Sequence, residues 1–66
     1  MSRATIRILP GRKGRLTRWM VEVEREGQRE VVSPPWPTKS DAIISAKLWA
    51  RENDEPDAVF LIAKKG

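Results

Sequence analysis

The sequence predicts a small α+β domain of β-β-β-α-β order: a three-stranded antiparallel meander, one helix packed on one face, and a closing carboxy-terminal strand. Three observations lead to this prediction. Polar and apolar residues alternate early in the chain, as they do in half-buried strands. Apolar residues then recur at helical spacing between Ala42 and Ala50, and a short apolar run follows at Ala58–Ala63. The length of 66 residues suits a single domain, residues 1–66.

The first predicted strand is Arg3–Ile8, in which every second residue is apolar. Pro10 and Gly11 are expected to end it, because proline offers no donor to a sheet and glycine tolerates turn geometry. Residues 11–15 would then form a flexible loop that carries three cations. The core-facing residues would be Ala4, Ile6 and Ile8, and the opposite face would carry Arg3, Thr5 and Arg7.

A second strand is predicted from Leu16 to Arg25, followed by a tight turn in which Gly27 adopts a positive φ. A short third strand would run from about Arg29 to Ser33, with Arg29 and Glu30 available to pair with Glu24 or Arg25 across the strands. The inner row of the second strand would be Trp19, Val21 and Val23, and the outer row Arg18, Met20, Glu22 and Glu24.

Three prolines in the segment Ser33–Pro37 exclude a helix or a central strand and predict an extended connector. We expect Trp36 to cap the edge of the core there, and the alternative is that the segment binds an aromatic groove on another protein. Thr38 has the position of a helix N-cap, and Asp41 stands at the third helical position, where a capping box has its acidic residue.

The predicted helix has two apolar stripes. The stripe that would face the sheet consists of Ala42, Ile43, Ala46, Trp49 and Ala50. Ile44 and Leu48 form the second stripe, and two interpretations of it are open. It packs beneath a loop or the terminal strand, or it is an exposed patch that makes the helix a dimer or partner surface.

The helix is expected to end at residues 53–57, where acidic residues surround Pro56. The final strand, Ala58–Ala63, is apolar on both faces, which is typical of a strand that is central or covered on each side. We expect it to pair with the first strand and to place one face under the helix. One helix covers only one face of a sheet, so the other face is left for solvent or a partner.

The chain contains no cysteine and no histidine, which excludes disulfides, thiolate metal sites and the usual general base. Its carboxylates fall in solvated turns and caps, so we predict a protein that is not an enzyme and has no cofactor and no metal site. The amino terminus lacks the apolar core of a signal peptide, and the longest apolar run is too short to span a bilayer. These features predict a cytoplasmic protein without a membrane partner.

Positive charge is concentrated in the first third of the chain. Residues 1–21 hold six of the 13 basic residues and no acidic residue, whereas all nine acidic residues follow. Such asymmetry favours a polyanionic partner, and an antiparallel ribbon can enter the major groove of DNA. The predicted nucleic-acid-binding residues are Arg3, Thr5, Arg7, Arg12, Lys13, Arg15 and Arg18.

Between Trp19 and Ala42 an alternating strand is followed by a glycine turn with a basic residue, an aromatic residue and a Thr-Lys-x-x-Ala helix start. The residues that carry this pattern are Trp19, Val21, Val23, Gly27, Arg29, Trp36, Thr38, Lys39 and Ala42. In this pattern, the chain resembles the arm-type DNA-binding domain at the amino terminus of tyrosine integrases from phages and mobile elements. The resemblance implies a three-stranded sheet lying in the DNA groove, backed by the helix. A family of short bacterial proteins of unknown function has nearly the same pattern and adds a terminal strand.

These observations lead to the hypothesis of a small DNA-binding module that uses its basic first hairpin, in the manner of a phage or mobile-element regulator. The alternative is a protein-interaction module, an inhibitor or adaptor of a host protein with no nucleic-acid role. It would present its basic face to an acidic protein, or would use the stripe of Ile44 and Leu48 to form a homodimer.

Overall fold

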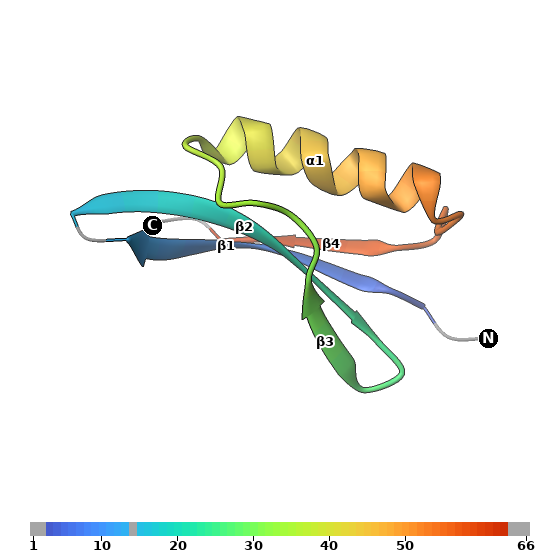
Figure 1. Cartoon of the computed structure of the whole chain (residues 1–66). Coiled ribbons are helices and arrows are strands. Elements are labelled where there is room, and N and C mark those ends of the chain that lie inside the picture. The colour runs from blue at the N-terminus through green and yellow to red at the C-terminus, as the bar shows by residue number, and fades with distance from the viewer. Residues whose placement is uncertain (1–2, 14, 64–66) are drawn as a thin grey trace.

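Within residues 3–13 and 15–63, which this computed structural model describes, the chain forms four strands and one helix (Figure 1). The side chains of Arg12 and Lys13 also lie outside the description. The elements, in order, are β1 (Thr5–Lys13), β2 (Leu16–Arg25), β3 (Gln28–Val31), α1 (Lys39–Glu52) and β4 (Val59–Ile62). The strand order in the sheet is β3-β2-β1-β4, with α1 on one face. The predicted α+β class and β-β-β-α-β order are confirmed.

The sheet is mixed and not purely antiparallel, because the predicted three-stranded antiparallel meander is joined by a last strand that runs parallel to its neighbour. β1 pairs antiparallel with β2, and β2 with β3, whereas β4 pairs parallel with β1. The direction follows from the path of the chain, because α1 carries it back across the sheet before β4 begins (Figure 1). The predicted pairing of the last strand with the first is confirmed.

Pro10 and Gly11 do not end β1, which continues through them to Lys13, so residues 11–13 of the predicted flexible loop are strand, while Gly14 lies outside the described residues. Backbone N–H groups of the β4 segment donate to the carbonyls of Ala4 and Ile8, so the even-numbered residues of β1 direct their backbone groups toward β4. Pro10 belongs to this even-numbered set. Its missing N–H therefore faces away from β2, and the ladder between β1 and β2 stays intact.

The core lies between α1 and the middle of the sheet. The alanines of α1 are buried, and α1 packs on β2 and β1. Alanine side chains are short, so the helix comes close to the branched residues of the strands. The buried residues are Ala4, Ile6, Ile8, Val21, Val23, Ala42, Ala46 and Ala50. Ile43 and Trp49 pack at the margin of this cluster, which confirms the predicted helix stripe.

The proline-rich connector continues the sheet beside β2 after β3 has ended. Trp19 and Trp36 exchange two backbone hydrogen bonds of 2.7 Å, and the Ser33 hydroxyl accepts a bond of 3.1 Å from the Val21 N–H. The third strand is thus Gln28–Val31, shorter than predicted. Trp36 packs against the core, as expected.

Both ends of α1 have capping hydrogen bonds. At the amino end, the Thr38 hydroxyl accepts a bond of 3.1 Å from the Asp41 N–H, which confirms the predicted N-cap. At the carboxyl end, the N–H of Glu55 donates to the carbonyl of Ala50 at 2.8 Å, and Asp54 adopts a φ of 54°. This is a Schellman motif with aspartate at the left-handed position that usually holds glycine.

The expectation that the last strand is central or covered on both sides, with one face under the helix, is wrong. β4 is an edge strand, and α1 packs on β2 and β1 instead. The side chains of β4 are exposed by 36–47%. A helix is about 10 Å wide, roughly two strand spacings, so one helix cannot cover four strands.

The left-handed φ of Asp54 predicts that glycine is more stable at this position. Asp54→Gly should raise the free energy of unfolding by about 0.5–1 kcal/mol, because glycine has no Cβ to crowd this backbone conformation. Chemical denaturation measures the change. Asp57→Gly is the control, since it removes the same charge from a residue without a positive φ. Equal or lower stability of Asp54→Gly relative to the control would contradict the prediction.

Candidate nucleic-acid interface

The sheet face opposite α1 carries charges of both signs where β1, β2 and β3 lie side by side. Arg7 Nη1 and Glu24 Oε1 lie 2.6 Å apart, and Arg29 Nε lies 3.5 Å from the same oxygen. The second pair confirms the predicted contact of Arg29 with Glu24. Arg7 also stands opposite Glu22 in the register of β1 and β2. Its guanidinium is therefore neutralised within the sheet and is poorly suited to hold a phosphate.

Among the described carboxylates, Glu24 has a pKa that is clearly lowered. The hydrogen bond from Arg7 lowers the pKa of Glu24 below its ordinary value of 4.5, and the charges of Arg29 and Arg7 act in the same direction. Partial desolvation opposes them without reversing the shift. The carboxylate therefore stays ionised in mildly acidic solution and keeps Arg7 paired.

Beyond this charged region, β1 and β2 extend as a two-stranded ribbon. β3 pairs with β2 only from Glu22 onward, and β4 pairs with β1 only as far as Ile8. The ribbon comprises residues 9–13 and 16–20, which pair with each other, while the connector adds a single bridge at Trp19. The hairpin runs along the length of a molecule measuring 40 × 21 × 19 Å (Figure 1).

The ribbon and its tip are basic and contain no acidic residue. Four predicted contact residues belong to this part of the chain: Arg12, Lys13, Arg15 and Arg18. Arg15 is exposed and Arg18 half-buried, and no ion pair between described residues includes either of them. The backbones of Arg12 and Lys13 stand opposite Thr17 and Leu16 in the ribbon.

The other three predicted contact residues, Arg3, Thr5 and Arg7, lie at the opposite end of β1. Arg3 is exposed just before the strand, and Thr5 is half-buried opposite Glu24. The structure thus separates the predicted set into an acid-free ribbon and a region where acidic side chains accompany the cations.

Lys39 is a basic residue near the ribbon that the sequence reasoning did not select. Its ammonium lies 5.6 Å from the centroid of the Trp19 ring, a distance typical of a cation–π contact. Trp19 belongs to the ribbon, so the first residue of α1 adds a cation beside it. The sequence shows only that Lys39 directly follows the helix N-cap Thr38. The folded connector is what brings this lysine to Trp19.

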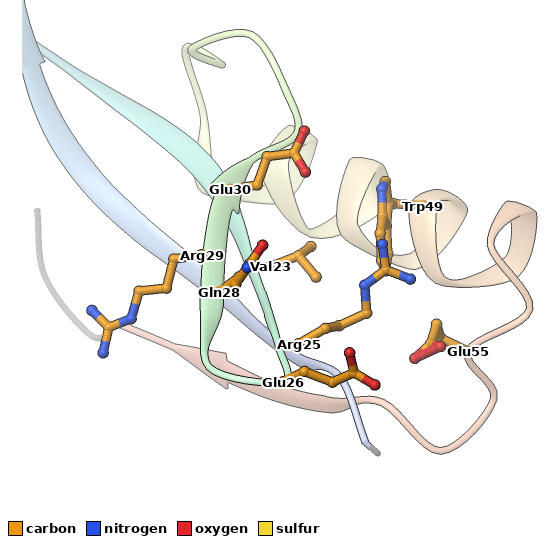
Figure 2. Close-up of a pocket in the computed structure, with 8 residues that line it drawn as sticks. All are labelled: Val23, Arg25, Glu26, Gln28, Arg29, Glu30, Trp49 and Glu55. Carbon is orange, nitrogen blue, oxygen red and sulfur yellow. The ribbon is translucent and has the colours of Figure 1, made fainter. Parts of the chain in front are cut away.

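A hollow between the β2–β3 hairpin and the end of α1 has mixed charge. Figure 2 shows the Arg25 guanidinium beside the Trp49 ring, and the two lie 5.3 Å apart. Five charged residues line the hollow: Arg25, Glu26, Arg29, Glu30 and Glu55. Three carboxylates make it less suited to a polyanion than the ribbon. Within the described ranges, no group of three acidic residues is arranged to hold a metal ion.

Ile44 and Leu48 are exposed by 58% and 49%, and no described loop or strand covers them. The interpretation that they pack beneath a loop or the terminal strand is therefore wrong. They border a groove between α1 and the connector, together with Val32, Trp36 and Trp49. The role of this patch as a protein interface stays a prediction.

The chain matches no family model, no curated protein and no solved structure. The resemblance to integrase arm domains therefore stays a prediction. In the part of the chain that the structure describes, the single helix is too short and too polar to cross a membrane.

The pairing with Arg7 predicts a specific pH dependence. A lowered folded-state pKa means that Glu24 contributes stability above its ordinary value of 4.5, and this contribution is lost as pH falls through the folded-state pKa. In Arg7→Ala, the pKa of Glu24 should rise toward 4.5, and the part of the acid-side loss of stability that comes from Glu24 should become smaller. An NMR titration of the Glu24 carboxyl measures the shift. Arg18→Ala is the control and should leave this pKa unchanged, whereas an unchanged pKa in Arg7→Ala would contradict the prediction.

Proposed function

We propose that the protein binds duplex DNA through the ribbon of β1 and β2 and acts as a small module without enzymatic activity. The observation that carries the proposal is a two-stranded antiparallel ribbon, beside which the described residues place no further strand over most of its length. The major groove of B-DNA is wide enough to admit such a ribbon. A sheet of four strands side by side is wider than the major groove and would not fit into it.

The charge of the ribbon supports the same proposal. Phosphates repel carboxylates and attract arginine and lysine, so an acid-free stretch with four cations is the part of this surface that suits DNA. Arg15 and Arg18 are the described side chains that remain available, because Arg7 is held by Glu24. The proposed interface is therefore narrower than the sequence predicts and is shifted toward the tip.

The base of the ribbon is anchored on one side. The two backbone bonds between Trp19 and Trp36 fix the ribbon to the connector, and Lys39 lies over the Trp19 ring. A fixed base reduces the ordering cost when the ribbon contacts DNA. A cytoplasmic regulator of a phage or mobile element fits this proposal, with support from the resemblance to integrase arm domains.

Charge removal at the ribbon tests the proposal. Arg15→Gln combined with Arg18→Gln should weaken duplex binding and reduce the slope of log affinity against log salt by about two, one for each lost phosphate contact. Fluorescence anisotropy with labelled duplex at several salt concentrations measures both quantities. The control combines Lys47→Gln with Arg51→Gln, which removes the same charge from exposed positions on α1.

The control variant should bind DNA with the slope of the wild type. Equal losses in the two double variants would show that only net charge matters, and the ribbon proposal would fail. The absence of duplex binding by the wild type at low salt would overturn the proposed function itself.

A second candidate function, that of an inhibitor or adaptor of another protein, is favoured by one observation. Ile44 and Leu48 are exposed on α1 beside the groove at Trp36. A protein captured from nuclease-treated lysate by the wild type, but not by Ile44→Ser combined with Leu48→Ser, would support it. Capture that survives this change would exclude the helix patch as the binding surface.

A further inference from the structure

The open edge of β4 has backbone groups directed away from the sheet. The N–H groups of Val59 and Ala63 donate to the carbonyls of Ala4 and Ile8 at 3.0 and 3.1 Å, on the side of β1. Backbone groups alternate in direction along a strand, so those of Phe60 and Ile62 face the open side. This edge therefore offers two donors and two acceptors to another strand.

The two edge strands of the sheet differ in charge, and therefore in their tendency to pair with another chain. β3, at one edge, has the sequence QREV, with two charged residues among four. β4, at the other edge, has the sequence VFLI and no charge. Charged residues on an edge strand oppose pairing with other chains, and an uncharged apolar edge strand invites it. The protein protects one edge in this way and leaves the other open.

β4 is apolar on both of its faces, and both are uncovered. The register with β1 places Phe60 and Ile62 on the face of the helix, and Val59 and Leu61 on the opposite face. These side chains are exposed by 38%, 43%, 36% and 47%, respectively. Such a sequence is typical of a strand with neighbours on both sides, and the isolated chain supplies only one neighbour.

We propose that β4 pairs antiparallel with β4 of a second copy of this chain, about a two-fold axis perpendicular to the sheet. The four-stranded sheets then join into one sheet with both helices on the same face. The ribbons of the two copies lie away from the shared edge. The proposal thus concerns a different surface from the DNA interface and does not depend on it.

Hydrogen bonding selects the register of the pairing. Two-fold symmetry places one residue opposite its own copy, and the overlap of the two strands is greatest when this is Phe60 or Leu61, the central residues of β4. With Leu61 at the axis, Phe60 of each copy faces Ile62 of the other, and all their outward donors and acceptors are satisfied. With Phe60 at the axis, the Ile62 carbonyl would need the N–H of Ala58, which already donates to Glu55 at 3.2 Å. The structure therefore favours the Leu61-centred register.

The edge of β4 is complementary to itself, which is why a second copy is the fitting partner. With Leu61 at the axis, the outward donors and acceptors of Phe60 and Ile62 in one copy meet the matching acceptors and donors of the other. The uncharged sequence VFLI then meets the same apolar side chains, and no charge is buried at the shared edge.

Sedimentation equilibrium from about 10 µM to about 1 mM protein tests the dimer. The wild type should shift from monomer toward dimer across this range. Leu61→Lys should remain monomeric at every concentration, because it places two cations face to face at the axis. The matched control is Val31→Lys, an exposed residue on the same face of the other edge strand. It should dimerise like the wild type, and circular dichroism should show that both variants are folded.

Amide hydrogen exchange of the wild type provides a test that needs no substitution. Exchange at Phe60 and Ile62 should slow by at least about tenfold when protein concentration rises across the dimer transition. Exchange at Val59 should change less, because its N–H already donates to β1. A wild type that stays monomeric, or a dimer without slower exchange at Phe60 and Ile62, would overturn the proposal.

Discussion

The fold depends on a close contact between the alanine face of α1 and the two central strands. Ala42 and Ala46 are fully buried against Ile6, Ile8 and Val21. A helix about 10 Å wide covers roughly two strands, so this contact covers β1 and β2 and reaches little further. The open sheet face, the projecting ribbon and the uncovered β4 all follow from having one helix over four strands. The surfaces that are available for function are those that the helix leaves uncovered.

Charge is segregated along the β1–β2 hairpin, and this segregation gives its two ends different properties. Near β3, the acidic row of β2 stands beside Arg7 and Arg29, and the pair with Glu24 neutralises Arg7, a predicted contact residue on β1. Toward the tip, basic residues have no acidic neighbours in sequence or across the ribbon. The positive charges of the hairpin are therefore balanced by carboxylates where it belongs to the sheet, and they are not balanced where it projects.

Local patterns predicted the elements well because each depended on nearby residues. Alternation identified β2, the Thr38 hydroxyl identified the start of α1, and the alanine spacing identified its buried face. Pro10 was misread because its effect depends on which way its missing N–H points. That direction depends on which neighbouring strand lies on each side of β1, and a local motif does not contain this information.

The candidate site was also predicted only in part. Charge asymmetry selected the basic residues of the first hairpin as the candidate site, but it could not separate Arg7 from Arg18. The pairing register decides that separation, because it sets Arg7 beside acidic residues and Arg18 opposite Gly11. Lys39 was missed for a related reason, since a connector of irregular backbone brings it to Trp19.

The sequence by itself determined the order of elements, the helix boundaries and the position of the basic segment, since these depend on periodicity, capping and composition over short distances. Only the tertiary structure decided that β4 runs parallel to β1 at an open edge and that Arg7 is neutralised by Glu24. It also decided that no strand within the described residues flanks most of the ribbon. The physical reason is that these features arise from contacts between residues far apart in the chain. Their geometry is set by which strands become neighbours and by how much of the sheet one helix can cover.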